Sequence, residues 1–260
     1  MTAARLLDCL ALALVAALGA SLLFASPALA WWERPEHILL VLLAVVGARL
    51  LAAPLSLPAL DPRRVLWVAV AAYALLFSFI TVTRHLTFLT HALDLGYYVQ
   101  LTWSLAQGRG PYVSLPEMHA WGDHLSPIMY LFVPAFWVAP GAVTLLVAQS
   151  VILALGALPV FAIARHRLGD ERPAAAFALL YLINPTLHGI NVRDFHAAAL
   201  AIPLLLAAMY LAEAGRPWLA AAAVALTLTT REDAAVPVAG LGLWLAAGGR
   251  WVAGGALALG

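Results

Sequence analysis

Long apolar runs separated by short polar clusters dominate this chain. A helix needs about 20 apolar residues to cross the hydrocarbon core of a bilayer. The runs predict eight spans, over residues 6–25, 37–55, 65–83, 141–164, 173–190, 197–213, 217–230 and 235–249. The last three are short for a span, but a polar cluster bounds each of them. The pattern predicts an all-α polytopic membrane protein, because a barrel would show weaker, alternating segments.

The apolar run 126–139 has a different character. Ser126 is suited to cap a helix and Pro127 to occupy its first position, and Pro140-Gly141 ends the run. A helix of about 14 residues is too short to cross and is typical of a re-entrant or interfacial segment. Its class decides the topology of everything that follows.

A second interfacial helix is expected in the loop 84–125, over residues 94–106. Its apolar stripe would be formed by Leu95, Tyr98, Val99 and Thr102. Tyr97, Tyr98 and Trp103 are aromatic residues of the kind that favour a membrane interface.

Composition strengthens the membrane assignment. Apolar residues make up 64% of the 260 positions and charged residues 10%, and the mean hydropathy is +0.94. Soluble domains carry about 45–50% apolar and about 25% charged residues. All 14 basic residues are arginine, which excludes a catalytic Schiff-base lysine and a P-loop lysine. The single cysteine, Cys9, excludes an internal disulfide and a cysteine-based metal site, and the net charge of +1 gives no case for nucleic acid.

Arginine placement favours one topology. If residues 1–5 are cytoplasmic and 126–139 does not cross, the inside loops carry Arg5, Arg63, Arg64, Arg165, Arg167, Arg172, Arg216 and Arg250. The outside loops then carry Arg34, Arg84, Arg109, Arg193 and Arg231. The alternative, in which 126–139 crosses, would move the cluster Arg165-His166-Arg167 outside. In the favoured topology every histidine except His166 faces outside, together with most of the acidic side chains.

Both ends of the chain need interpretation. The segment 1–30 resembles a cleavable signal peptide ending in Ala28-Leu29-Ala30, but Asp8 weakens its basic start and favours a plain first span. The run from Trp251 stops at Gly260 and is too short to cross, so the chain is expected to be the N-terminal part of a longer protein. We expect residues 1–64 to form two N-terminal spans and 65–260 to form the main transmembrane module, incomplete at its C-terminus.

Four polar clusters carry the candidate chemistry. The first contains Arg84, His91 and Asp94; the second Asp123 and His124; the third Arg193, Asp194 and His196; the fourth Arg231, Glu232 and Asp233. Ionisable groups near a bilayer centre cost about 2.5–3.5 kcal/mol each, so they are read first as functional. A structural interpretation stays open for each: an N-cap at Asp94, helix-orienting caps at Asp123 and His124, and solvated turns in the third and fourth clusters. No histidine pair has the spacing of a helical zinc site.

The strings Ala92-Leu93-Asp94-Leu95-Gly96-Tyr97-Tyr98-Val99-Gln100, Gly122-Asp123-His124-Leu125-Ser126-Pro127, Arg193-Asp194-Phe195-His196 and Arg231-Glu232-Asp233-Ala234 resemble the bacterial membrane family DUF2079, a domain of unknown function. They stand in that family's order and extend over about residues 84–250. The layout is in turn similar to the GT-C membrane glycosyltransferases, such as protein O-mannosyltransferases and lipid A aminoarabinose transferases. The two extra N-terminal spans depart from that layout, as does Arg231, where many relatives carry lysine.

The GT-C resemblance implies an inverting sugar transfer from a polyprenyl phosphate or pyrophosphate donor, on the extracytoplasmic side of the bacterial cytoplasmic membrane. It implies that Asp94 is the base, that Asp194 positions the acceptor or an arginine, and that Arg231, Arg193 and Arg84 are candidates to bind phosphate. The other residues assigned to substrate are His91, Asp123, His124, His196, Glu232 and Asp233. No metal ligand is assigned, although a divalent cation, Mg²⁺ or Mn²⁺, stays an open question. The implied partners are the lipid bilayer and the lipid-linked sugar; none is implied among nucleic acids.

Two other classes compete with the enzyme. Polar clusters between broken helices also suit a transporter or a lipid flippase. Transporter sites tend to lie near the bilayer midplane and to come from internal repeats, whereas here the polar groups gather on one side and no repeat is visible. A non-catalytic membrane scaffold is the third class, and it should tolerate Asp94→Asn and Arg231→Gln.

Overall fold

The computed structural model describes residues 3–23, 35–52, 60–114 and 117–248 and is mostly helical. The chain divides into two compact units, Met1–Leu60 and Asp61–Gly260. In the first unit, α1 (Ala3–Leu23) and α2 (Pro35–Ala52) contact each other, and Arg49 Nε donates to Asp8 Oδ1 over 2.7 Å. These helices lie on the predicted runs 6–25 and 37–55. The candidate cleavage site at 28–30 lies outside the described residues.

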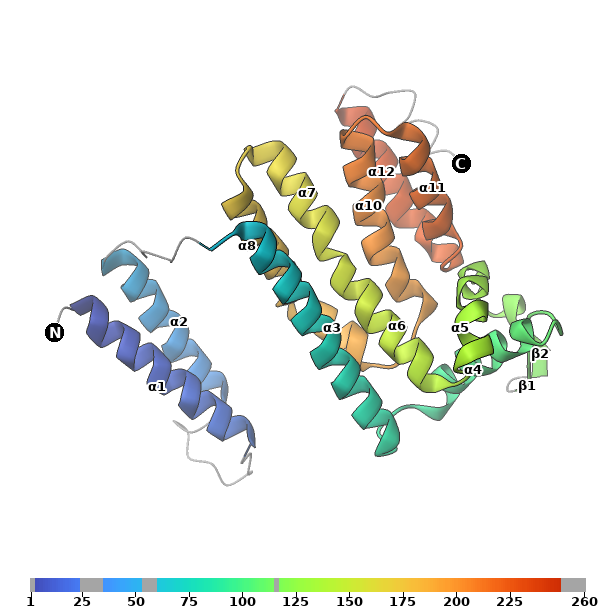
Figure 1. Cartoon of the computed structure of the whole chain (residues 1–260), viewed down its shortest axis with the longest axis horizontal. Coiled ribbons are helices and arrows are strands. Elements are labelled where there is room, and N and C mark those ends of the chain that lie inside the picture. Colours follow the sequence, from blue (N-terminus) through green and yellow to red (C-terminus); the bar gives the residue numbers. More distant parts are fainter. Residues whose placement is uncertain (1–2, 24–34, 53–59, 115–116, 249–260) are drawn as a thin grey trace. The chain divides into compact units, whose positions relative to one another are not determined.

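The second unit is built on α3 (Pro62–Leu86), α6 (Ala142–Leu155) and α7 (Ala157–Leu168). Asp61 caps α3 by accepting from the backbone N–H of Arg63, with Pro62 at the first helical position. Helices α6 and α7 run end to end, and α6 packs along α3 (Figure 1). Both α3 and the continuous rod Ala142–Leu168 are long and apolar enough to cross a membrane.

The predicted span 173–190 is broken. It forms α8 (Glu171–Leu182) and α9 (Pro185–Val192), which are bent by 43° and count as a third span only if the pair is taken together. Pro185 has no N–H to continue the ladder of α8. Asn184 restarts the helix by accepting from the N–H of Thr186 over 2.9 Å. The local sequence Asn184-Pro185 is therefore the cause of the break.

The last three predicted spans are helices, but short ones. They are α10 (Ala201–Glu213, preceded by the 3₁₀ turn η4, Ala197–Leu200), α11 (Pro217–Leu228) and α12 (Ala235–Ala247, preceded by η5, Glu232–Ala234). Each α-helix has 12 or 13 residues. At 1.5 Å per residue that is about 20 Å, less than the ~30 Å hydrocarbon core. Of the six spans predicted in the second unit, two, or three if the α8–α9 pair is taken as one, are therefore long and apolar enough to cross a membrane.

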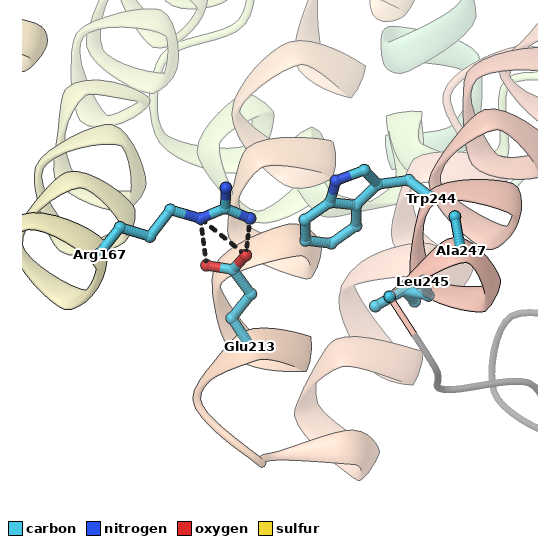
Figure 2. Close-up of a pocket in the computed structure, with 6 residues that line it drawn as sticks. Arg167, Glu213, Trp244, Leu245 and Ala247 are labelled. Atoms are coloured by element: carbon cyan, nitrogen blue, oxygen red, sulfur yellow. Dashed lines mark hydrogen bonds and ion pairs between the residues drawn. The ribbon is translucent and has the colours of Figure 1, made fainter.

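Basic residues gather at one end of the second unit. Glu171, at the start of α8, pairs with Arg63 of α3 over 2.6 Å and with Arg165 of α7 over 3.2 Å. Arg167 pairs with Glu213 of α10, and its guanidinium lies 5.4 Å from the ring of Trp244 (Figure 2). These pairs tie together the helix ends that carry the Arg165-His166-Arg167 cluster.

The opposite end carries the small elements between α3 and α6. These are α4 (Ala92–Ala106), β1 (Tyr112–Ser114), β2 (Glu117–His119), η2 (Ala120–Gly122), η3 (Pro127–Phe132) and α5 (Val133–Val138). Strands β1 and β2 form an antiparallel pair, with Val113 opposite Met118, so the all-α prediction was wrong in this loop. The short helix predicted at Ser126-Pro127 exists, but it starts as a 3₁₀ turn and Ser126 makes no side-chain cap. Pro134 lacks the N–H needed for one uniform helix across 127–138.

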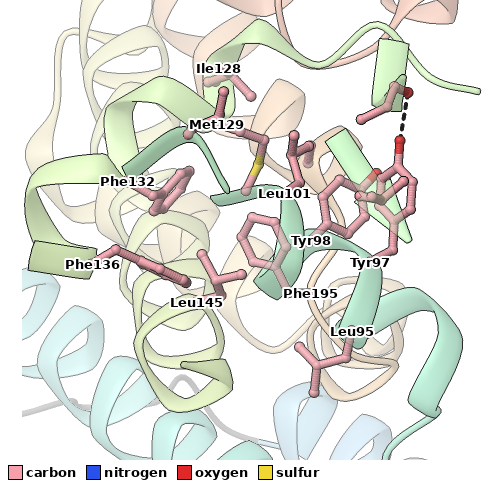
Figure 3. Packing of buried hydrophobic residues seen from close by; sticks show 14 of the residues in the cluster. Leu95, Tyr97, Tyr98, Leu101, Ile128, Met129, Phe132, Phe136, Leu145 and Phe195 are labelled. Carbon is pink, nitrogen blue, oxygen red and sulfur yellow. Dashed lines mark hydrogen bonds between the residues drawn. The ribbon is translucent and has the colours of Figure 1, made fainter. Parts of the chain in front are cut away.

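Helix α4 is covered on a broad face rather than lying on the surface. Leu95, Tyr98 and Leu101 pack against Met129 and Phe132 of η3, Phe136 of α5 and Phe195 from the turn after α9 (Figure 3). The ring of Phe195 meets Tyr98 and Phe132 edge-on, with centroids 5.3 and 5.5 Å apart. Tyr97, predicted as an interface aromatic, is buried and its hydroxyl donates to the carbonyl of Ala120 over 2.6 Å. This core fixes α4 against the loop that carries the second cluster.

Candidate functional site

The first and third clusters meet through a buried carboxylate. Oδ2 of Asp194 accepts from the backbone N–H of His91 over 2.9 Å and lies 2.9 Å from Nδ1 of the same residue. Asp194 is 1% exposed, its backbone has φ +96°, and its Oδ1 has no partner among the described residues. His91 occupies the N-cap position of α4, so Asp94 lies in the first turn and the N-cap interpretation of Asp94 was wrong.

The second and fourth clusters meet through another carboxylate. Glu232 Oε1 lies 2.8 Å from Nδ1 of His124, and Oε2 accepts from the N–H of Leu125 over 3.0 Å. The N–H of Ile128 donates to the carbonyl of Thr229 over 3.0 Å. Hydrogen bonds from its own backbone N–H, from His124 and from Leu125 outweigh burial and lower the pKa of Glu232 to about 2. The start of η3 is thus fastened to the start of η5.

A single pocket of about 320 Å³ receives residues from all four clusters. Its lining consists of Leu93, Asp94, Tyr97, Tyr98, Asp123, His124, Arg193, His196 and Arg231. Six of these were predicted from the sequence as site residues, namely Asp94, Asp123, His124, Arg193, His196 and Arg231. Burial raises the pKa of Tyr97 to about 12, so its hydroxyl stays a donor. The pocket combines carboxylates, guanidinium groups, imidazoles and aromatic rings.

The charged groups of the pocket differ in how far they are already paired. Asp94 Oδ2 lies 3.8 Å from Nε2 of His196, and Arg231 Nη2 lies 3.0 Å from Oδ2 of Asp233. Nε of Arg231 is buried without a hydrogen-bond partner in the described chain. The exposed side chains of Arg193 and Asp123 make no ion pair or hydrogen bond with any residue that the structure describes. One guanidinium and one carboxylate are therefore available to a ligand.

The other predicted residues stand outside the lining. Four of them contact lining residues or the sequence neighbours of lining residues without lining the pocket themselves. These are Asp194, His91, Glu232 and Asp233. Arg84 is separate, because it donates to the carbonyl of Leu89 over 2.9 Å and closes the turn after α3. The structure thus brings ten of the eleven predicted residues into one assembly and leaves Arg84 at the adjoining turn.

A buried amide that contacts this assembly was not predicted from the sequence. Gln149 of α6 is fully buried, its Nε2 donates to the carbonyl of Asp194 over 2.9 Å, and its Oε1 accepts from the N–H of His196 over 2.9 Å. The signal was present, since an amide in the middle of the apolar run 141–164 is costly unless it is hydrogen-bonded. The sequence predicts Tyr97 and Tyr98 only as interface aromatics, whereas both line the pocket.

The described residues do not form a ready-made cluster of metal ligands. In the part of the chain that the structure describes, no group of three or more histidine, cysteine, aspartate or glutamate side chains could hold a metal ion. A second hollow of about 450 Å³, beside Arg167, Glu213 and Trp244 (Figure 2), contains none of the predicted site residues.

Comparison with known proteins gives a family. A family model described as a predicted membrane protein, DUF2079, matches residues 84–260. No curated protein and no solved structure matches the chain. The match begins at Arg84 and includes every residue of the pocket. This chain belongs to DUF2079, a family of predicted membrane proteins whose function is unknown.

Proposed function

We propose that this protein is a membrane glycosyltransferase of the GT-C type, which transfers a sugar from a polyprenyl phosphate or pyrophosphate to an acceptor. The observation that carries the proposal is the lining of the 320 Å³ pocket, where the carboxylate of Asp94 and the guanidinium groups of Arg193 and Arg231 occur together. Such a reaction needs a base for the acceptor and cations for the leaving phosphate.

Each group has a role in an inverting displacement. The acceptor hydroxyl attacks the anomeric carbon while its proton passes to the carboxylate of Asp94. The bond from the anomeric carbon to the phosphate oxygen breaks, and the electron pair leaves with the phosphate. Arg193 and Arg231 stabilise that charge, because a guanidinium binds phosphate oxygens through two parallel hydrogen bonds.

The remaining lining suits a sugar. Tyr97 and Tyr98 offer aromatic rings, and Asp123, His124 and His196 offer hydrogen-bonding groups for hydroxyls. Asp194 is 1% exposed and outside the lining, so its role in the proposal is to position His91 and the start of α4 rather than to contact substrate.

The arrangement supports an extracytoplasmic site. The pocket lies beyond the end of α3 and beyond the end of α9, whereas Arg63, Arg165 and Arg167 cluster at the start of α3 and the end of α7. Arginine-rich helix ends tend to stay in the cytoplasm. The proposed site therefore faces the other side of the bacterial cytoplasmic membrane, where a lipid-linked donor presents its head group.

The test measures sugar release from a panel of polyprenyl-phosphate and polyprenyl-pyrophosphate sugars by membranes that contain the protein. We expect turnover of one donor, abolished by Asp94→Asn and reduced by Arg231→Gln, with Glu117→Gln of strand β2 unchanged as the matched acidic control. Equal turnover in wild type and Asp94→Asn, or no turnover of any donor by folded protein, would overturn the proposal.

One observation favours a transporter or flippase as the second candidate. The α8–α9 pair is bent by 43° and leads directly into Arg193 and Asp194, as the broken helices of transporters lead into their sites. A flippase would move the intact lipid-linked sugar across vesicles without releasing the sugar. The same donor panel, read for translocation instead of cleavage, separates the two functions.

A further inference from the structure

We propose that Gln149 is a positioning residue for this pocket, because its buried amide fixes the Asp194–His196 turn and so holds the imidazole of His196 beside Asp94. Its effect on catalysis rests on the proposed glycosyltransferase function. Its effect on the geometry of the pocket does not, and the two are tested separately.

The amide contacts the turn on both sides of Phe195. Nε2 donates to the carbonyl of Asp194 over 2.9 Å and, less closely, to that of Asn191 over 3.4 Å. Oε1 accepts from the N–H of His196 over 2.9 Å. Only one orientation of the amide satisfies these partners, since two are acceptors and one is a donor.

The turn needs such support because its backbone is strained. Asp194 has φ +96°, a region that side-chain-bearing residues rarely occupy and that persists only when the surroundings hold it. His91 fixes the Asp194 side chain and Gln149 fixes the main chain on either side. Phe195, which is fully buried against Tyr98 and Phe132, anchors the middle of the turn.

The consequence reaches the pocket through His196. The backbone N–H of His196 donates to Gln149, and Nε2 of the same histidine lies 3.8 Å from Oδ2 of Asp94. If the amide is removed, the carbonyl of Asp194 and the N–H of His196 are left buried without this partner. The turn then relaxes and the imidazole moves relative to the proposed base.

The first test compares Gln149→Met with Ser150→Ala. Ser150 is the next residue of α6 and is equally buried, but its side chain bonds Asn191 and the carbonyl of Leu146 instead of the turn. In ¹⁵N-histidine-labelled protein, we expect Gln149→Met to shift the ring signals of His196, identified by their loss in His196→Asn, and Ser150→Ala to leave them in place. In the transfer assay, we expect kcat to fall at least about tenfold for Gln149→Met while the donor KM changes less than about threefold.

The second test uses Gln149→Glu. A protonated carboxylic acid can donate to the carbonyl of Asp194 and accept from His196, as the amide does, whereas the ionised form lacks the donor. Burial disfavours the ionised form. We therefore expect the His196 signals of this variant to approach those of wild type as the pH falls, and its kcat relative to wild type to rise over the same range.

The outcomes separate the two proposals. If wild type transfers no sugar, the proposed function fails, and the His196 signals still decide the role of Gln149. If Gln149→Met leaves those signals as Ser150→Ala does, the positioning role is overturned. Should Gln149→Met fail to fold, the Gln149→Glu variant decides, because His196 signals that differ from those of wild type by the same amount at every pH would contradict the inference.

Discussion

At the scale of single residues, carboxylate side chains form many of the ion pairs and hydrogen bonds that connect segments far apart in the sequence. The carboxylate of Glu232 is hydrogen-bonded to the ring of His124 and to the backbone N–H of Leu125, which lie 108 and 107 positions earlier in the chain. Its side chain is 49% exposed, so the ion pair is screened by solvent and contributes less than a buried pair would. The contact therefore matters more for placing the second cluster than for overall stability.

The lowered pKa of Glu232 predicts a specific pH dependence. Its pKa falls from the usual 4.5 to about 2 on folding, so its stabilisation is present above pH 4.5 and is lost as the pH falls through about 2. We expect wild type to lose thermal stability between about pH 5 and pH 2 more steeply than Glu232→Gln. Unfolding midpoints in detergent across this range provide the measurement, and parallel curves for the two proteins would contradict it.

Most of the candidate side chains were predictable because they stand out from an apolar background. Asp94, Arg193, His196 and Arg231 each occur in a short polar interruption between long apolar runs. Gln149 was not found because a single uncharged amide inside a span resembles tolerated helix variation. The positive φ of Asp194 could not be predicted either, because this conformation is expected for glycine and the residue is an aspartate.

At the scale of elements, Gly156 sets how closely α6–α7 approaches α8. A Cβ at this position would overlap the hydroxyl of Tyr181, which donates to the carbonyl of Leu153 over 2.8 Å. We expect Gly156→Ala to destabilise the protein by about 1–3 kcal/mol through overpacking. Gly240→Ala in α12 is the matched control, because a Cβ there meets no atom within 4 Å. Equal unfolding midpoints for the two variants would refute this explanation.

The turn after α3 stores strain at Phe88. The N–H of Phe88 bonds the carbonyl of His85 and the N–H of Leu89 bonds that of Arg84, an arrangement in which glycine is the usual left-handed residue. Phe88 has φ +59° and is 93% exposed. We expect Phe88→Gly to stabilise the protein by about 1 kcal/mol, because the left-handed conformation is costly for a residue with a Cβ.

The neighbouring Leu89 is the control for that prediction. It is 58% exposed and its φ is not positive, so glycine there only adds entropy to the unfolded chain. Leu89→Gly should lower stability by about 0.5–1 kcal/mol. If the thermal unfolding midpoint falls in both variants, the backbone strain at Phe88 does not determine the effect of glycine on the stability of this turn.

The elements themselves were largely predictable, and their interruptions were not. Apolar runs correctly located the helices of both units, and Ser126-Pro127 located the start of η3. The lengths of the apolar runs did not predict that Asn184-Pro185 bends the fifth run, 173–190, by 43° or that β1 and β2 pair. The bend depends on the position of a proline and the strand pair on hairpin contacts. A count of apolar residues predicts neither of them.

At the scale of the whole second unit, the ion pairs of Arg63, Arg165 and Arg167 and the pocket lie at opposite helix ends. This predicts different labelling of two engineered cysteines in a Cys9→Ser background. Tyr112→Cys, at an exposed position of β1, should react with an impermeant maleimide on intact cells. His166→Cys, exposed near the end of α7, should react only after permeabilisation. The reverse pattern would contradict the proposed orientation.

The assembly of the four clusters is the part that sequence reasoning could least supply. His91 and Asp194 are 103 positions apart, and no local pattern states that they meet. Their chemistry was predictable from residue type, whereas their pairing depends on α4 and the turn after α9 sharing one core around Phe195.

Asp94→Asn separates donor binding from sugar release and so tests whether this pocket is the site of transfer. Labelled polyprenyl-phosphate sugar is offered to wild type and to Asp94→Asn in the same reconstituted membranes, and bound donor and released sugar are both measured. We predict that Asp94→Asn binds the donor with a Kd within about threefold of wild type and releases sugar at least about a hundredfold more slowly. Sugar release at the wild-type rate by Asp94→Asn would contradict the assignment of this pocket as the site of transfer.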